Sequence, residues 1–310
     1  MRARKIGAMA IFLLSTFGRD TAGSREPEMP LAEVPFKLHR NAVILEATVN
    51  GSEPLRLLLD TGWGPLALVS SAAERLKLEP EKTDGDYPLV QVESLAIGGA
   101  VRRNAKFEVF PAQELEPLIG PHDGVLSTAF FKDLVLQIDY PAGIVRFYSK
   151  SPIPTTPPAE PRTRSSVPMV ILQRVGALPF TDAVLVDGKP VRALFDTGGA
   201  GSFMVMKQLV DRAELEVLPD DGGKVAIGML SGGHASQTTV QFVRVGRIAL
   251  GAFGVDSPRV MVAPSGLEGD DWGHDLNIGY GFMRDYIVTF DYPGRAITFE
   301  LPAAGDHEPR

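Results

Sequence analysis

Residues 55–64, LRLLLDTGWG, and residues 191–200, VRALFDTGGA, each place an apolar run directly before an Asp-Thr-Gly triplet. The runs are rich in Leu, Val and Phe, which predicts buried strands that end at Asp60 and Asp196. An unpaired charge in such a setting is costly, so each carboxylate should have a partner or a chemical task. One such triplet is weak evidence, whereas two at equivalent places in the chain are a strong signal.

The surroundings of the triplets are repeated as well. ATVNGSEPLRLLLDTG in the first half matches VLVDGKPVRALFDTG in the second, each with an Asn-Gly or Asp-Gly pair between two β-rich runs. Such pairs predict tight hairpins. Each half then closes with a run ending in Asp-Tyr-Pro, which predicts a second hairpin with Asp139 or Asp291 in a structural role at its turn. We therefore expect a mainly β, bilobal fold of two homologous lobes, with short helices after the triplets at 70–78 and 204–215.

The ends and the middle of the chain divide it into parts. The basic opening MRARK and the apolar stretch IGAMAIFLLSTFG predict a signal peptide over residues 1–24, and hence an exported, periplasmic or secreted protein. A buried N-terminal helix is the alternative. Residues 151–168 are rich in Pro and lack hydrophobic periodicity, which is typical of a linker. This leaves an N-terminal lobe at 25–150, a C-terminal lobe at 169–302 and a tail at 303–310.

Composition narrows the class of function. The 310 residues are 44% hydrophobic and 22% charged with a net charge of −7, which indicates a globular chain and favours neither nucleic acid nor an anionic membrane surface. No segment after the signal peptide is long and apolar enough to span a membrane. The sequence has no cysteine, which excludes disulfides, thiolate zinc sites and a cysteine nucleophile.

Two neighbouring carboxyl groups suit amide hydrolysis by water. The reaction needs a base to take a proton from the water and an acid to protonate the carbonyl oxygen. Two carboxylates a few ångströms apart cannot both ionise easily, so they share one proton and supply both functions. The titration then belongs to the pair, and neither Asp60 nor Asp196 can be assigned as the acid or the base.

With both triplets in place, the sequence resembles the pepsin and retropepsin superfamily of aspartic proteases, in particular bacterial exported two-lobed members. The resemblance implies two β-barrel-like lobes and catalysis by Asp60 and Asp196, without organic cofactor or metal. It also implies a peptide or protein substrate in the cleft between the lobes. We expect a monomer, because both lobes lie in one chain, and the net charge favours no role in binding nucleic acid. Loop support would come from Thr61 and Thr197, whose hydroxyls hydrogen-bond across the junction in the family, and from Gly62 and Gly198.

Three positions depart from that family. Trp63 and Gly199 stand where Ser, Thr or Ala usually follows the triplet, and Trp63 is a candidate to line or crowd the cleft. In the apolar-apolar-Gly element that packs beside each loop, NIGYGF supplies Gly279 but VLSTAF has Ser127. A catalytically degenerate peptide- or envelope-binding protein of the same fold therefore stays open. So does pairing of each lobe with its counterpart in another chain, although lobes in one chain have the advantage of effective concentration.

The family also closes a β-hairpin flap over its substrate. The longer second half offers AIGMLSGG at 226–233, with candidate flap residues Ile227, Gly228, Met229, Leu230, Ser231, Gly232 and Gly233; an ordinary surface hairpin is the alternative. Two His-Asp pairs, His122-Asp123 and His274-Asp275, occupy equivalent repeat positions, but their spacing favours polar turns over a metal site. Complete dinucleotide-binding, phosphate-loop and serine-hydrolase motifs are not present in the sequence.

Overall fold

The computed structural model describes residues 28–83, 85–154, 163–172, 176–219, 224–227, 236–264 and 272–302. The predicted signal peptide at 1–24 and the predicted tail at 303–310 lie outside these residues. Within the described part, no helix has both the length and the apolar character that crossing a membrane requires.

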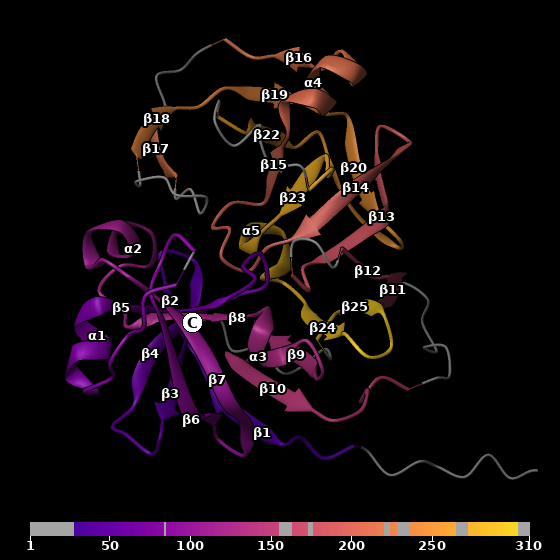
Figure 1. The fold of residues 1–310 in the computed structure, drawn as a ribbon. Coiled ribbons are helices and arrows are strands. Elements are labelled where there is room, and N and C mark those ends of the chain that lie inside the picture. The colour runs from indigo at the N-terminus through magenta and orange to yellow at the C-terminus, as the bar shows by residue number, and fades with distance from the viewer. Residues whose placement is uncertain are drawn as a thin grey trace, which may run out of the picture.

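The chain forms two lobes of mainly β structure, which confirms the predicted fold class (Figure 1). In the N-terminal lobe six strands form a ring, because β6 pairs with β7 on one side and with β3 on the other. Around the ring they are β3 (Ala42–Val49), β4 (Leu55–Asp60), β8 (Gly124–Ser127), β5 (Leu66–Val69), β7 (Ala100–Phe110) and β6 (Leu89–Ile97), with β2 (Lys37–His39) beside β3. The helices are α1 (Ser70–Arg75), α2 (Ala112–Ile119) and α3 (Thr128–Phe131).

The C-terminal lobe repeats the central pairings. Its sheet runs β16 (Glu216–Val217), β19 (Phe242–Arg244), β22 (Arg259–Val262), β15 (Phe203–Val205), β23 (Leu276–Ile278), β14 (Lys189–Phe195), β13 (Pro179–Val186), β20 (Arg247–Leu250) and β21 (Phe253–Asp256), with β12 (Val170–Ile171) beside β13. A separate hairpin pairs β17 (Lys224–Ile227) with β18 (Ser236–Thr239). The helices are α4 (Lys207–Ala213) and α5 (Tyr280–Met283).

The two predicted tight hairpins are present. Asn50 and Gly51 join β3 to β4 with φ values of 52° and 71°, and Asp187 and Gly188 join β13 to β14 with 48° and 78°. Two successive positive φ values define the turn whose twist matches that of the flanking strands, and Asn-Gly and Asp-Gly are the pairs that adopt it most readily.

A six-stranded sheet joins the lobes. Its order is β1 (Ala32–Pro35), β10 (Ile144–Tyr148), β9 (Val135–Asp139), β24 (Ile287–Asp291), β25 (Ala296–Glu300) and β11 (Arg164–Pro168). The two Asp-Tyr-Pro hairpins form its middle, where β9 and β24 pair antiparallel along five residues each. Both edge strands end in proline, which an edge tolerates because one side of the strand needs no ladder partner.

One boundary predicted from the sequence is wrong. Residues 164–168 fall inside the predicted linker at 151–168, yet they form strand β11 and pair with β25. Val167 is buried there, and Ser166 hydrogen-bonds to Thr298 over 2.7 Å. The high proline and serine content hid an edge strand, because pairing with β25 supplies the order that the local sequence lacks.

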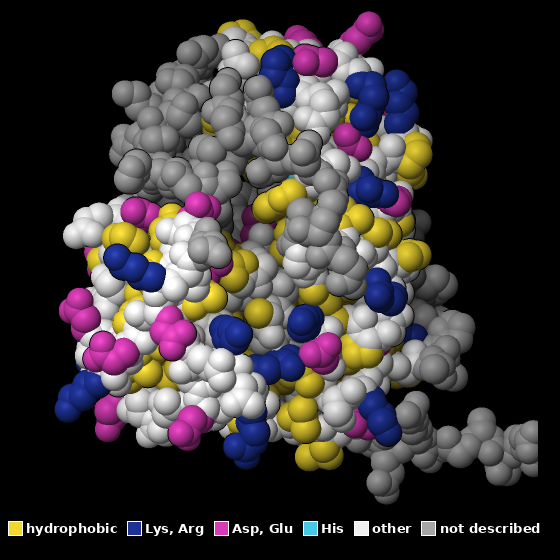
Figure 2. Space-filling view, viewed as in Figure 1, with side chains coloured by type: hydrophobic (Ala, Val, Ile, Leu, Met, Phe, Trp, Pro, Cys, Tyr) yellow, Lys and Arg dark blue, Asp and Glu magenta, His cyan; other side chains and the backbone are white. Residues whose placement is uncertain are grey.

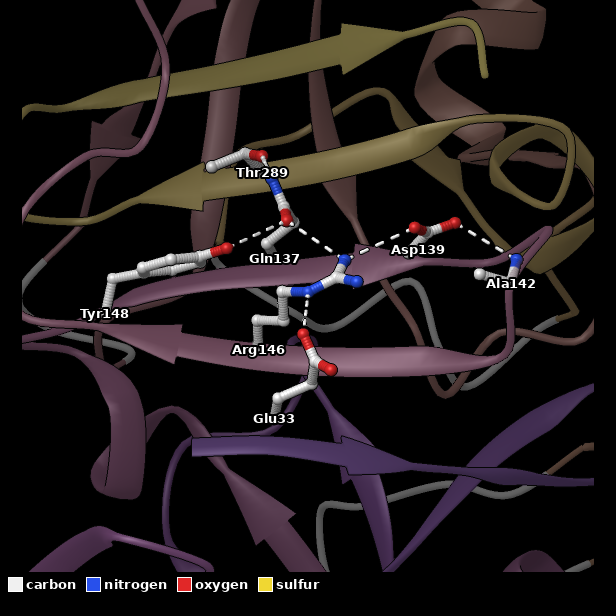
Figure 3. Close-up of polar contacts among 7 residues, drawn as sticks. All are labelled: Glu33, Gln137, Asp139, Ala142, Arg146, Tyr148 and Thr289. Atoms are coloured by element: carbon white, nitrogen blue, oxygen red, sulfur yellow. Dashed lines mark hydrogen bonds and ion pairs between the residues drawn. The ribbon is translucent and has the colours of Figure 1, made fainter. Parts of the chain in front are cut away.

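Polar side chains connect the lobes across this sheet (Figure 3). The Gln137 amide donates to Thr289 Oγ1 at 3.0 Å, which links β9 to β24, and its carbonyl oxygen accepts from the Tyr148 hydroxyl at 3.3 Å. Arg146 contacts Gln137 and Asp139 and pairs with Glu33 of β1 at 2.6 Å.

The core is aromatic as well as aliphatic. Its largest fully buried side chains include Phe107, Phe130, Phe131 and Phe147 from the first half and Phe180, Phe195, Phe290 and Phe299 from the second. On the outside, basic and acidic side chains are interspersed over the described part of the face shown in Figure 2. The core and the joining sheet together fix the positions of the loops that carry the two triplets.

Candidate active site

The strands of each lobe bring the aspartate that begins each triplet to the junction between the lobes. Strand β4 runs parallel to β8, with Asp60 opposite Ser127, and β14 runs parallel to β23, with Phe195 opposite Ile278. Strands β5 and β15 then pair antiparallel with β8 and β23, so each triplet forms the turn between two strands that flank a common neighbour. Strand β4 is rich in leucine because it is one of the strands of the ring and is buried on both faces over most of its length.

The two threonines lock the loops together. The Thr61 hydroxyl donates to the Phe195 carbonyl at 2.7 Å and accepts from the Thr197 N–H at 3.1 Å. The Thr197 hydroxyl donates to the Leu59 carbonyl at 2.8 Å and accepts from the Thr61 N–H at 3.0 Å. Both side chains are buried, so these four hydrogen bonds hold the lobes in one register.

The glycines of the triplets allow the carboxylates to meet. A Cβ built on Gly62 would lie 2.7 Å from Cγ of Asp196, and one built on Gly198 would lie 2.4 Å from an oxygen of Asp60. Each carboxylate therefore packs against the backbone of the opposite loop, where no side chain fits. Each carboxyl group perturbs the pKa of the other, as expected of two neighbouring acids.

Burial raises the pKa of both carboxyl groups. Repulsion from Asp196 raises the pKa of Asp60 further, while the backbone N–H groups of Gly62 and Gly198 act in the opposite direction. The N–H groups of Gly198 and Gly199 donate to Asp196 Oδ1 at 2.9 and 3.1 Å and likewise lower its pKa. A desolvated pair of this kind keeps one proton between the two groups at pH values where separate carboxyls are both ionised.

Trp63 lies behind its loop. Its side chain is 4% exposed and packs edge to face on Phe110, with ring centroids 5.7 Å apart. Within the described residues it therefore supports the loop of the first triplet from the core of the N-terminal lobe. Gly199, at the equivalent position, contributes its backbone N–H to Asp196.

Ser127 fits the site where the family has glycine. Its hydroxyl donates to the Gly64 carbonyl at 2.8 Å and accepts from the Ala129 N–H at 3.3 Å, which caps α3. The equivalent Gly279 has no such space, because a Cβ there would lie 2.4 Å from the carbonyl oxygen of Gly199. The departure in the first lobe thus replaces a close backbone approach with two hydrogen bonds.

The two His-Asp pairs lead into β8 and β23. The Asp123 carboxylate accepts from the Arg56 N–H and pairs with Arg75 at 2.6 Å. Asp275 accepts from the Arg192 N–H and pairs with Arg212 at 2.9 Å. Both aspartates thus hold polar turns together. Among the described side chains, no group of three or more His, Asp and Glu residues is arranged to hold a metal ion.

The predicted flap is only partly inside the described residues. Ile227 ends strand β17 opposite Ser236, so this part of the second half is a hairpin. In Figure 1 the hairpin stands on the side of the molecule that also carries α2 of the N-terminal lobe. Gly228, Met229, Leu230, Ser231, Gly232 and Gly233 lie outside the described residues, and their role as a flap stays a prediction.

Two further buried tyrosines belong to the junction and were not expected from the sequence. Tyr140 and Tyr292 follow the turn aspartates of the two Asp-Tyr-Pro hairpins, and burial together with the charges of Asp196 and Asp60 raises their pKa values. The repetition of Tyr-Pro at equivalent positions of the two halves is the signal that could have identified them.

The comparisons agree with this geometry. The family model described as aspartyl protease matches residues 45–130 and 183–282, one segment in each lobe and each containing one triplet. Comparison with curated proteins finds none that matches. The two matched segments cover more than half of the sequence, and the chain therefore belongs to the aspartyl protease family.

Proposed function

We propose that this family member is an active aspartic endopeptidase that hydrolyses peptide bonds with a water held between Asp60 and Asp196. The observation that carries the proposal is the reciprocal packing of the two loops, in which each carboxylate lies against the glycine of the other triplet. The four hydrogen bonds of Thr61 and Thr197 support the same geometry.

The proposed reaction uses the pair in its singly protonated form. The ionised carboxyl takes a proton from the water as the oxygen attacks the peptide carbonyl, and the protonated carboxyl donates its proton to the carbonyl oxygen. Collapse of the tetrahedral intermediate breaks the C–N bond, and a proton passes from the dyad to the leaving nitrogen. One hydroxyl of the intermediate returns its proton to the dyad as the carboxylic acid product forms, so the pair again holds one shared proton. The N–H groups of Gly62, Gly198 and Gly199 hold the carboxylates in place throughout.

The proposed substrate is an extended peptide in the cleft between the lobes. Export to the periplasm or the outside of the cell is part of the proposal and rests on the basic and apolar opening of the sequence. A single chain supplies both aspartates, which supports action as a monomer.

The test is cleavage of a mixed peptide library by the chain without residues 1–24 between pH 3 and 7, with and without pepstatin. Asp60→Asn and Asp196→Asn serve as the controls, because Asn keeps the shape of the side chain but cannot share the proton. We expect cleavage by the intact protein and a loss of at least about 10⁴-fold in either variant, on the order of what removal of a triad member costs in serine proteases.

Two outcomes contradict the proposal. Cleavage that survives both substitutions excludes the dyad. Measurable peptide binding without cleavage by the intact protein favours the degenerate peptide- or envelope-binding alternative. The molecular mass in solution tests the monomer independently of activity.

A further inference from the structure

Two buried tyrosines follow the strands at the centre of the joining sheet, and each contacts the opposite lobe. Tyr140 belongs to the β9–β10 hairpin of the first half and Tyr292 to the β24–β25 hairpin of the second, and the side chains are 8% and 3% exposed. Because β9 pairs with β24 at the centre of the joining sheet, the turn of each hairpin lies beside the opposite half of the molecule.

Each tyrosine packs on a short helix of the opposite lobe. In each case that helix follows the strand that pairs with the strand leading into the triplet. The Tyr292 ring lies 5.6 Å from that of Phe131 in α3, and α3 directly follows the β8 residue that pairs with Asp60. The Tyr140 ring lies 5.7 Å from that of Tyr280, the first residue of α5, whose N–H donates to the Gly199 carbonyl. The two contacts are related by the same internal repeat as the triplets.

Neither hydroxyl has a hydrogen-bond partner among the described residues. A buried hydroxyl without a partner is unfavourable, and phenylalanine fills the same space without that cost. Two such tyrosines at equivalent positions therefore require an explanation other than packing. Tyr280 and Asp196 are the titratable groups whose charges act on Tyr140, and the charge of Asp60 acts on Tyr292.

The hydroxyls stay protonated under all conditions in which the dyad titrates. Burial and then the charge of Asp60 raise the pKa of Tyr292 well above its ordinary value. Burial and then Tyr280 and Asp196 raise the pKa of Tyr140. Both groups are thus available as hydrogen-bond donors, and a nearby carboxylate is the strongest acceptor for such a donor.

We propose that Tyr140 and Tyr292 are positioning residues for the dyad, each donating through one bridging water to the aspartate of the opposite lobe, Tyr140 to Asp196 and Tyr292 to Asp60. They supply the hydroxyl donors that Trp63 and Gly199, which follow the triplets, do not supply. This inference rests on the proposed function and adds to it a second pair of residues, each of which acts on the aspartate of the opposite lobe.

A donor to the carboxylate stabilises the ionised form and so lowers the pKa values of the pair. Removing one hydroxyl should therefore move both limbs of the pH profile of kcat/KM to higher pH. We expect Tyr140→Phe and Tyr292→Phe each to shift the profile upward by about 0.5–1 pH unit and to lower kcat about 3- to 30-fold, with KM changed less than about twofold. Substrate binding is spared because the hydroxyls are buried and act on the substrate only through the carboxylates.

Tyr148→Phe is the matched control. Tyr148 is a buried tyrosine of the same first-half hairpin, but its hydroxyl donates to Gln137 on the joining sheet. The Tyr148→Phe variant also loses a buried tyrosine hydroxyl, but one that lies away from the dyad, so its pH profile of kcat/KM should coincide with that of the wild type. A shift in Tyr148→Phe equal to those of the other two variants would assign the effect to general loosening and overturn the proposal.

A second measurement does not need proteolysis. In Asp60→Asn only Asp196 of the dyad titrates, and ¹³C-carboxyl NMR of labelled aspartate follows it directly. We expect the added Tyr140→Phe to raise the Asp196 titration midpoint and the added Tyr292→Phe to leave it within about 0.2 pH unit, with the opposite result for Asp60 in Asp196→Asn. This crossed pattern decides the proposal even for a chain without protease activity, and equal or absent shifts for the two tyrosines refute it.

Discussion

Replacing Thr61 with valine tests whether the loop junction holds the lobes together. Valine has nearly the same shape, so the substitution removes one buried oxygen and leaves the packing. The lost oxygen makes two hydrogen bonds, to the Phe195 carbonyl at 2.7 Å and from the Thr197 N–H at 3.1 Å. Both partners are backbone groups of the other lobe and would be left buried without a partner.

Each such group costs about 1–3 kcal/mol, and the extra apolar methyl of valine offsets a small part. We therefore expect Thr61→Val to lower the free energy of unfolding by about 2–4 kcal/mol, which for a protein of this size moves the urea midpoint by roughly 1 M. The displaced carboxylates should also lower kcat by about 10- to 100-fold.

The assay is urea unfolding followed by the fluorescence of Trp63 and Trp272, one in each lobe. Thr181→Val is the control, since Thr181 is also fully buried but accepts a single bond, from the Ala183 N–H at 3.2 Å within the C-terminal lobe. Its expected cost is about 1 kcal/mol. If Thr61→Val is no more destabilising than this control, the cross-lobe hydrogen bonds do not hold the junction and the reasoning is refuted.

Three further predictions concern the same loops. Gly62→Ala should lower kcat at least about 100-fold in a peptide-cleavage assay, because its Cβ would lie 2.7 Å from Asp196 Cγ, whereas Gly201→Ala, with nothing within 4 Å, should leave kcat unchanged. Ser127→Ala should cost about 1–2 kcal/mol in thermal unfolding, since it removes the cap of α3 and the bond to the Gly64 carbonyl; an unchanged melting temperature would contradict this. Because the carboxyl pKa values are raised, the folded protein holds the shared proton to higher pH than the unfolded chain does. The shared proton therefore stabilises the folded state fully below the carboxyl pKa of the unfolded chain, and this stabilisation is lost as the pH rises through the pKa of the folded protein. The unfolding free energy of the wild type should therefore fall relative to that of Asp60→Asn as the pH is raised from about 4 to 7, and parallel curves would rule out the coupled pair.

Local sequence was sufficient for much of the architecture. The Asn50-Gly51 and Asp187-Gly188 turns need only their own φ preferences, and the hairpins before the triplets formed where those pairs predicted. The leucine and valine runs before Asp60 and Asp196 marked buried strands, because side-chain periodicity is a property of a few consecutive residues. The internal repeat then implied that both lobes have the same central pairings.

Other features were decided only when the lobes came together. Strand β11 forms at 164–168 because β25 offers it an edge, and nothing in that proline-rich stretch signals the pairing. Trp63 turned into the core because Phe110 lies there, and Ser127 found its acceptor in Gly64, a residue 63 positions away. The partners of Thr61 are 134 and 136 residues distant.

The sequence by itself thus determined the strands that end at the two triplets, the tight turns before them and the choice of the two aspartates, since these depend on short-range preferences and on a motif repeated in the chain. Only the tertiary structure decided that the aspartates meet, what holds them there and which tyrosines pack on the helices beside them. The reason is that hydrogen bonds and desolvation at the junction depend on distances between groups far apart in sequence, and no local pattern records those distances.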